Sequence, residues 1–128
     1  MIEQPHSTVQ QSNNINYNSE ELEEEFFTDF GRLGRMFAQA KSERAGLEQY
    51  RKALRAELMV KAAESGVKSF QNQQRDAEAN PRYYEIIAAY EAAVLKESRS
   101  YMELELLRLK FEKWRTSRAD ERAAMNMR

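Results

Sequence analysis

Hydrophobic residues recur at helical spacing over a stretch of the chain, from Pro81 to Met127, that contains no glycine and no second proline. Asn80 can cap a helix there, and Pro81 suits its first position because that position needs no N–H donor. We therefore expect one long amphipathic helix over residues 81–126. Its main apolar stripe is Tyr83, Ile87, Tyr90, Val94, Tyr101, Leu104, Leu107, Phe111 and Trp114.

A second apolar line appears only in the C-terminal half of that helix, at Met102, Leu106 and Leu109. A helix that packs against one partner helix needs a single apolar face. The second line therefore predicts a further contact. We interpret these three residues as a surface for a partner or for a second copy of the chain.

The first half of the chain predicts a matching helix over residues 19–65. Asn18 and Glu21 have the spacing of a capping box, and Gly66 suits the position that follows a helix end. Gly31, Gly34 and Gly46 interrupt the pattern, as a bend, a break near 31–34 or a close approach of another backbone. The apolar stripe has 4–3 spacing and includes two arginines: Phe26, Phe30, Leu33, Phe37, Ala40, Arg44, Leu47, Arg51, Leu54 and Leu58.

Two segments lie outside the long helices. Residues 1–18 are rich in Gln, Asn and Ser without an apolar period, which predicts a flexible tail. Residues 66–80 form a polar connection with a candidate short helix that starts at Ser69. Gln71, Gln74 and Arg75 are candidate contacts for a partner at this tip, although an exposed tip is polar in any case.

Two long helices joined by one connection predict an all-α antiparallel hairpin, a single domain over residues 19–128. The charges agree: residues 19–29 hold six acidic residues and no basic residue, whereas basic residues gather near the other end of the chain. Because a two-helix hairpin leaves the second apolar line uncovered, we expect a homodimer that forms a four-helix bundle. The alternative is that residues 66–80 fold back over the line.

Composition excludes several chemistries. The chain has 128 residues, a net charge of -1, no Cys and one His, His6 in the tail. Thiolate metal sites and disulfides are therefore excluded, and no His–carboxylate spacing or glycine-rich phosphate loop is present. We expect no catalytic, cofactor or metal site. No apolar run is long enough for a membrane span, so we expect a cytoplasmic protein.

Basic residues interleaved with Phe111 and Trp114 permit a second interpretation. Such a pattern can follow a phosphate backbone while the aromatic rings stack on bases. The competing interpretation is that the rings belong to the core and the charges form a solvated face. The candidate nucleic-acid contacts are Arg108, Lys110, Lys113, Arg115 and Arg118.

Three segments carry a resemblance to a known group of proteins: FGRLGRMFAQAKSER over 30–44, NPRY over 80–83 and EKWRTSRADERA over 112–123. Together they resemble small coiled-coil-containing helical proteins of tailed bacteriophages, often from early regions that encode recombination or replication functions. The resemblance implies a phage origin and a host-cytoplasm setting, and it assigns no functional residue. The expected function is non-enzymatic: an accessory or inhibitor that contacts recombination, replication or host DNA-processing proteins. Direct DNA binding is the alternative.

Overall fold

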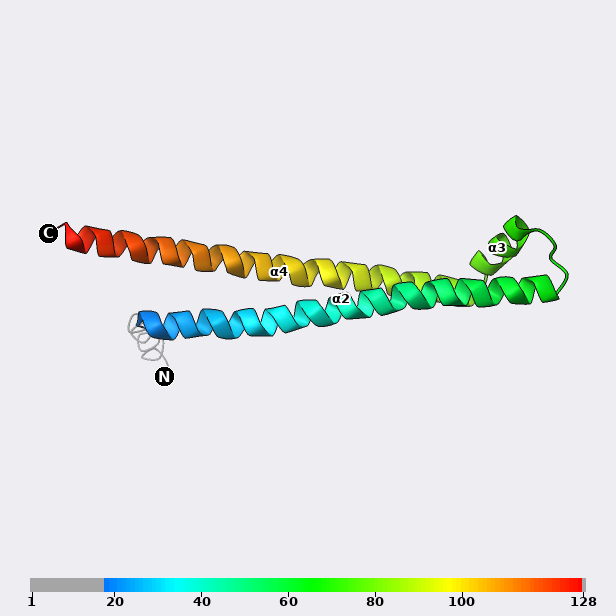
Figure 1. Ribbon diagram of the computed structural model, residues 1–128, viewed down its shortest axis with the longest axis horizontal. Helices are drawn as coiled ribbons and strands as arrows, with labels where there is room; N and C mark the ends of the chain where they lie inside the picture. Colours follow the sequence, from blue (N-terminus) through cyan, green and yellow to red (C-terminus); the bar gives the residue numbers. More distant parts are fainter. Residues whose placement is uncertain (1–17, 128) are drawn as a thin grey trace, which may run out of the picture. The chain divides into compact units, whose positions relative to one another are not determined.

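The computed structural model describes residues 18–127, and within them every regular element is a helix. Helix α2 spans Ser19–Glu64, the short helix α3 spans Phe70–Glu78, and α4 spans Pro81–Asn126 (Figure 1). The all-helical fold with two long helices is therefore confirmed. Residues 1–17 of the expected tail lie outside the described residues.

Local hydrogen bonds fix both ends of α2. Asn18 accepts the backbone N–H of Glu21 at 2.8 Å and donates its side-chain amide to the Glu21 carboxylate at 3.2 Å. At the other end Gly66 has φ 104°, and Val67 N–H donates to the Ala62 carbonyl at 3.0 Å. This left-handed residue and the six-to-one bond form a Schellman ending, which explains why a glycine follows the helix.

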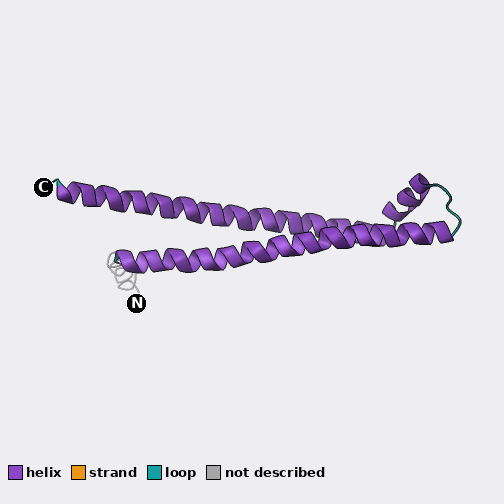
Figure 2. Cartoon of the chain, in the orientation of Figure 1, coloured by secondary structure: helices purple, strands orange, loops and turns teal. Residues whose placement is uncertain are grey.

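The connection contains the short helix α3 (Figure 2). The Ser69 hydroxyl caps it by accepting the backbone N–H of Asn72 at 3.1 Å. Asn80 then caps α4, because its side-chain oxygen accepts the N–H of Arg82 at 2.9 Å. Pro81, which has no N–H to satisfy, occupies the first turn.

The glycines do not break α2, which is continuous from Ser19 to Glu64. A Cβ atom added at Gly34 or Gly46 would meet no atom within 4 Å. Neither position therefore serves a close approach of backbone within the described residues.

The described chain divides into two compact units. Unit 1 comprises the described residues up to Arg32 together with those from Leu106 onward. Unit 2 is Leu33–Glu105, which includes α3.

Unit 2 has a small apolar core in which α3 takes part. Leu54 and Leu58 of α2, Ala77 of α3 and Tyr83 of α4 are all buried and in contact. Met59, Ile86 and Ile87 pack against this cluster. Ala77 is thus the residue through which the otherwise polar α3 is anchored.

Farther along unit 2, the seam between α2 and α4 differs from the expected stripe. Val94 and Tyr101 are 38% and 47% exposed, whereas Ala93 and Ser100, one position earlier, are buried. The buried and half-buried positions recur at alternating steps of three and four: Tyr90, Ala93, Glu97, Ser100 and Leu104. The choice of Val94 for the seam was wrong, whereas the Tyr101 ring, although half-exposed, lies 5.6 Å from the Phe37 ring of α2.

Aromatic rings form the core of unit 1. Phe111 of α4 has ring centroids 5.2 Å from Phe26 and 5.7 Å from Phe30, both in edge-on geometry. Trp114 lies 5.4 Å from Phe26 and stacks with Phe111 at 5.7 Å. Offset and edge-on pairs of this kind stabilise a core beyond the apolar area they bury.

Candidate interaction surfaces

The line predicted from Met102, Leu106 and Leu109 is exposed in the structure. Their exposed fractions are 56%, 54% and 55%, and Leu95 is 51% exposed. On α4 these positions turn away from Ser100, Leu104 and Leu107, which are buried or half-buried in the seams. We call Leu95, Met102, Leu106 and Leu109 the outer face of α4.

The alternative cover is contradicted by these exposures. If the connection folded back over the line, Met102, Leu106 and Leu109 would be buried. Instead α3 uses Ala77 to contact Leu54, Leu58 and Tyr83. The connection therefore does not cover the outer face.

Leu95 is a member of the outer face that sequence reasoning missed. It lies seven residues before Met102, which lies seven before Leu109, and the same interval leads back to exposed Ala88. A seven-residue repeat is the spacing of a coiled-coil seam. This regular interval could have identified Leu95 from the sequence. It was overlooked because the expected apolar stripe used the neighbouring residue Val94 at this turn of the helix.

The tip residues predicted as contacts are not brought together as a set. Gln71 and Arg75 are exposed, but Gln74 is half-buried and its amide donates to the Glu78 carboxylate at 3.2 Å. Glu78 also pairs with Arg55 of α2 at 3.5 Å. Gln74 therefore belongs to the attachment of α3 to α2.

An apolar hollow at the same tip was not anticipated. It is open, has a volume of about 600 Å³, and lies between the end of α2 and the start of α3. Phe70, Val60 and Met59 line it, and Phe70 is 69% exposed. The signal in the sequence was Phe70 itself, the one large apolar residue in a polar helix.

The candidate nucleic-acid contacts occupy different environments. Arg108 pairs with Glu112 at 3.7 Å, and Lys110 and Lys113 are exposed. The guanidinium of Arg115 lies 5.8 Å from the Phe111 ring centroid, and that of Arg118 lies 5.8 Å from the Trp114 centroid. Cation–π contact holds these two side chains near the helix surface.

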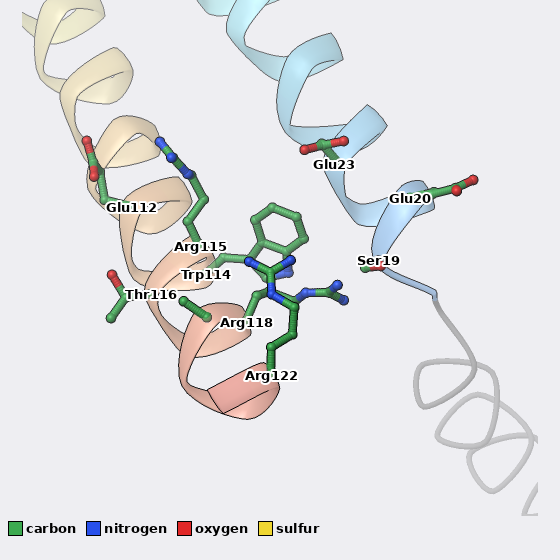
Figure 3. Close-up of a pocket in the computed structure, with 10 residues that line it drawn as sticks. Ser19, Glu20, Glu23, Glu112, Trp114, Arg115, Thr116, Arg118 and Arg122 are labelled. Atoms are coloured by element: carbon green, nitrogen blue, oxygen red, sulfur yellow. The ribbon is translucent and has the colours of Figure 1, made fainter. Parts of the chain in front are cut away.

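Arg115, Arg118 and Arg122 line an open hollow of about 520 Å³ in unit 1 (Figure 3). Ser19, Glu20 and Glu23 from the start of α2 line it as well, and Glu20 points away from α4. None of the three arginines forms an ion pair within residues 18–127. The acidic start of α2 therefore lies beside the basic end of α4 without neutralising it through direct contact.

Phe111 and Trp114 take part in the core of unit 1, and Trp114 also lines the open hollow beside Arg115 and Arg118 (Figure 3). Both rings are half-buried, and both contact Phe26 within the core of unit 1. These contacts agree with the interpretation in which the rings belong to the core. The nucleic-acid interpretation stays a prediction.

Both arginines in the seam of unit 2 have partners on α4. Arg44 Nε donates to Glu97 at 2.7 Å, and its Nη1 donates to Glu48 at 2.9 Å. The hydrogen bond to Glu97 is the main reason that the pKa of Arg44 is raised. Arg51 lies 5.5 Å from the Tyr90 ring centroid and donates a long bond of 3.5 Å to the Tyr83 hydroxyl.

The described residues contain no group of three or more His, Cys, Asp or Glu side chains placed to hold a metal ion. In the same part of the chain, no helix is both long and apolar enough to cross a membrane. Comparison with known proteins found no matching family, no matching curated protein and no matching solved structure.

Proposed function

We propose that the chain is a non-enzymatic helical interaction protein that binds a helical partner through the outer face of α4. The observation that carries the proposal is the exposure of Met102, Leu106 and Leu109, each by more than half, in one line along a helix. Single exposed apolar residues are ordinary on protein surfaces. A continuous line at helical spacing is the arrangement by which one helix docks against another.

Burial supplies the driving force for such docking. A leucine side chain taken fully out of water stabilises a complex by about 1.5–3 kcal/mol before the costs of association. Three leucines and one methionine form the outer face. The assembly we propose is a homodimer of four long helices in which the outer faces of the two copies of α4 lie in contact.

The proposal extends to biology through the resemblance to small helical proteins of tailed bacteriophages. In that setting the protein acts in the host cytoplasm, as an accessory or inhibitor of recombination, replication or host DNA-processing proteins. Contact between proteins, without chemistry on a substrate, is the mode of action.

Affinity purification with matched variants tests this proposal. Tagged wild-type chain, a Leu106→Glu/Leu109→Glu variant and a Val60→Glu control are purified from cells that also express an untagged copy. Val60 is 57% exposed and lies on α2, so the control adds the same kind of charge elsewhere. We expect the outer-face variant alone to lose its bound polypeptides. Identical sets in all three samples would contradict the proposal.

Direct nucleic-acid binding is a second candidate function, favoured by the absence of described ion pairs for Arg115, Arg118 and Arg122. Phosphate binding must weaken steeply with salt, because counterions are released. A gel-shift titration with single- and double-stranded DNA at two salt concentrations tests it. We expect an Arg115→Ala/Arg118→Ala/Arg122→Ala variant to bind more weakly than the wild type. No shift of wild-type protein at low salt would exclude this function.

A further inference from the structure

We infer that the occupant of the outer face of α4 is the same face of a second copy, running antiparallel about a two-fold axis that passes near Met102. This inference rests on the proposed function and adds the direction and register of the second copy of α4. Its evidence is the placement of apolar and charged residues along α4, an uninterrupted helix from Pro81 to Asn126.

The spacing on the outer face suits a helical occupant. Leu95, Met102 and Leu109 recur every seven residues, and Leu106 adds the intervening step of four and three. Side chains at this spacing lie on one side of the helix and form the kind of seam along which two helices pack. A flat surface or an extended peptide would not select this repeat.

The residues on either side of Met102 match in size and oppose in charge. Leu95 and Leu109 lie seven residues before and after it, and Glu91 and Lys113 lie eleven residues before and after. An antiparallel copy centred on Met102 therefore brings Leu95 to the partner's Leu109. It also brings Glu91 to the partner's Lys113, and symmetry makes each contact twice.

A parallel copy would produce the opposite electrostatic result. It would set Glu91 beside Glu91, Lys113 beside Lys113 and Arg99 beside Arg99. In the antiparallel copy the two Arg99 residues are offset by six positions, about 9 Å along the helix axis. None of these three residues forms an ion pair within the described chain, so their charges remain available to a partner.

Cysteine cross-linking reports the direction directly, because the natural sequence contains no Cys. A disulfide needs Cα atoms about 4.4–6.8 Å apart. We expect Met102→Cys to form a cross-linked dimer on mild oxidation. Leu95→Cys alone should not cross-link, since the two positions would lie about 21 Å apart along the axis.

Mixing completes the cysteine experiment. Leu95→Cys and Leu109→Cys chains that carry tags of different size should form a mixed disulfide when combined, while neither links to itself. Val60→Cys is the control for random collision and should form no intermolecular disulfide under oxidation. Efficient self-linking of Leu95→Cys would overturn the antiparallel arrangement.

Charge reversal provides a second measurement that leaves the apolar residues intact. Glu91→Lys should weaken the dimer several-fold by setting two lysines together, and Lys113→Glu should do the same with two glutamates. The double variant should restore the dimerisation constant, which sedimentation equilibrium measures. A double variant as weak as the single variants would overturn the pairing.

The inference and the proposed function fail in different ways. A chain in which Met102→Cys does not cross-link, but in which Leu106→Glu/Leu109→Glu still abolishes capture of other polypeptides, overturns the second copy as occupant. The interaction function would stand in that case. Capture that is unaffected by the outer-face variant removes the function itself.

Discussion

The two units of this chain differ in the side chains that pack between α2 and α4. In unit 1 the seam is aromatic, with Phe111 in contact with Phe26, Phe30 and Trp114. In unit 2 the seam passes from small residues to an ion pair, Arg44 with Glu97 at 2.7 Å, before it reaches the core around Leu54. Apolar rings supply contact area, whereas a charged layer specifies which residues face each other.

In unit 2, further ion pairs connect α2 with α4. Lys96 pairs with Glu43 at 3.0 Å, and Arg82 pairs with Glu57 at 3.3 Å. As residue numbers rise along α2 they fall along α4, so these pairs define the antiparallel direction within this unit. Because the two units differ in this way, we expect truncated apolar side chains and reversed charges to change the stability of the two units by different amounts.

Leu54→Ala should have the largest effect on stability. Leu54 is 2% exposed at the centre of the core of unit 2, and the truncation leaves a cavity there. We expect the free energy of unfolding to fall by about 3 kcal/mol. Urea denaturation followed by circular dichroism measures it, with Val60→Ala as the exposed control. A loss no larger than that of the control would remove the core assigned to this unit.

Phe111→Ala tests the aromatic seam of unit 1. The ring contacts four other aromatic rings but remains half-buried, so we expect a smaller loss of about 2 kcal/mol. The same denaturation measures it. Phe70→Ala is the matched control because Phe70 is largely exposed. Equal effects of the two substitutions would show that the ring cluster does not hold unit 1.

Charge exchange across unit 2 should have an intermediate effect. Glu97→Arg places two cations in one layer and should lower the melting temperature more than Glu85→Arg, which changes an exposed carboxylate of α4 in the same unit. Adding Arg44→Glu should recover most of the loss, although Glu48 would then face a like charge. A double variant no more stable than Glu97→Arg alone would show that the layer does not set the pairing.

Gly46→Ala should raise stability in unit 2. The added methyl group meets no atom within 4 Å, and alanine is about 1 kcal/mol better than glycine inside a helix. Thermal denaturation measures the gain. A destabilised variant would reveal a close contact at Gly46 and reverse the interpretation of that glycine.

The smallest expected effect is a loss of stability at low pH through Glu57. Hydrogen bonds from Arg82 and Lys61 lower the pKa of Glu57 below its ordinary value of 4.5. A carboxylate whose pKa is lowered in the folded state stabilises the fold at higher pH. Its contribution is lost as the pH falls from about 4.5 through the lowered pKa. Urea midpoints between pH 6 and pH 3 should therefore fall less in Glu57→Gln than in the wild type. Parallel curves would show that Glu57 does not contribute.

Much of the secondary structure could be anticipated because its signals are local. Asn18, Ser69 and Asn80 cap helices by hydrogen bonds that reach only two or three residues, and Gly66 ends α2 through its own φ. The outer face of α4 was visible for the same reason, since helical spacing places Met102, Leu106 and Leu109 together.

The seam of unit 2 could not be anticipated because it depends on the opposite helix. Glu97 and Ser100 are unremarkable on α4 alone, and the placement of Glu97 in the seam follows from its hydrogen bond with Arg44 on α2. A search for large apolar residues selects Val94 instead. The same dependence explains why Gln74 was predicted as a contact for a partner. The sequence does not show that Gln74 bonds to Glu78, which pairs with Arg55 of α2.

The central claim is that the outer face of α4 is an interface, and the mass of the protein in solution tests it most directly. Sedimentation equilibrium of the wild type should give twice the 15.0 kDa of one chain, and Leu106→Glu should give a single chain with unchanged helix content. A wild type that sediments at 15.0 kDa at all concentrations would contradict the homodimer, as would a Leu106→Glu variant that keeps the doubled mass.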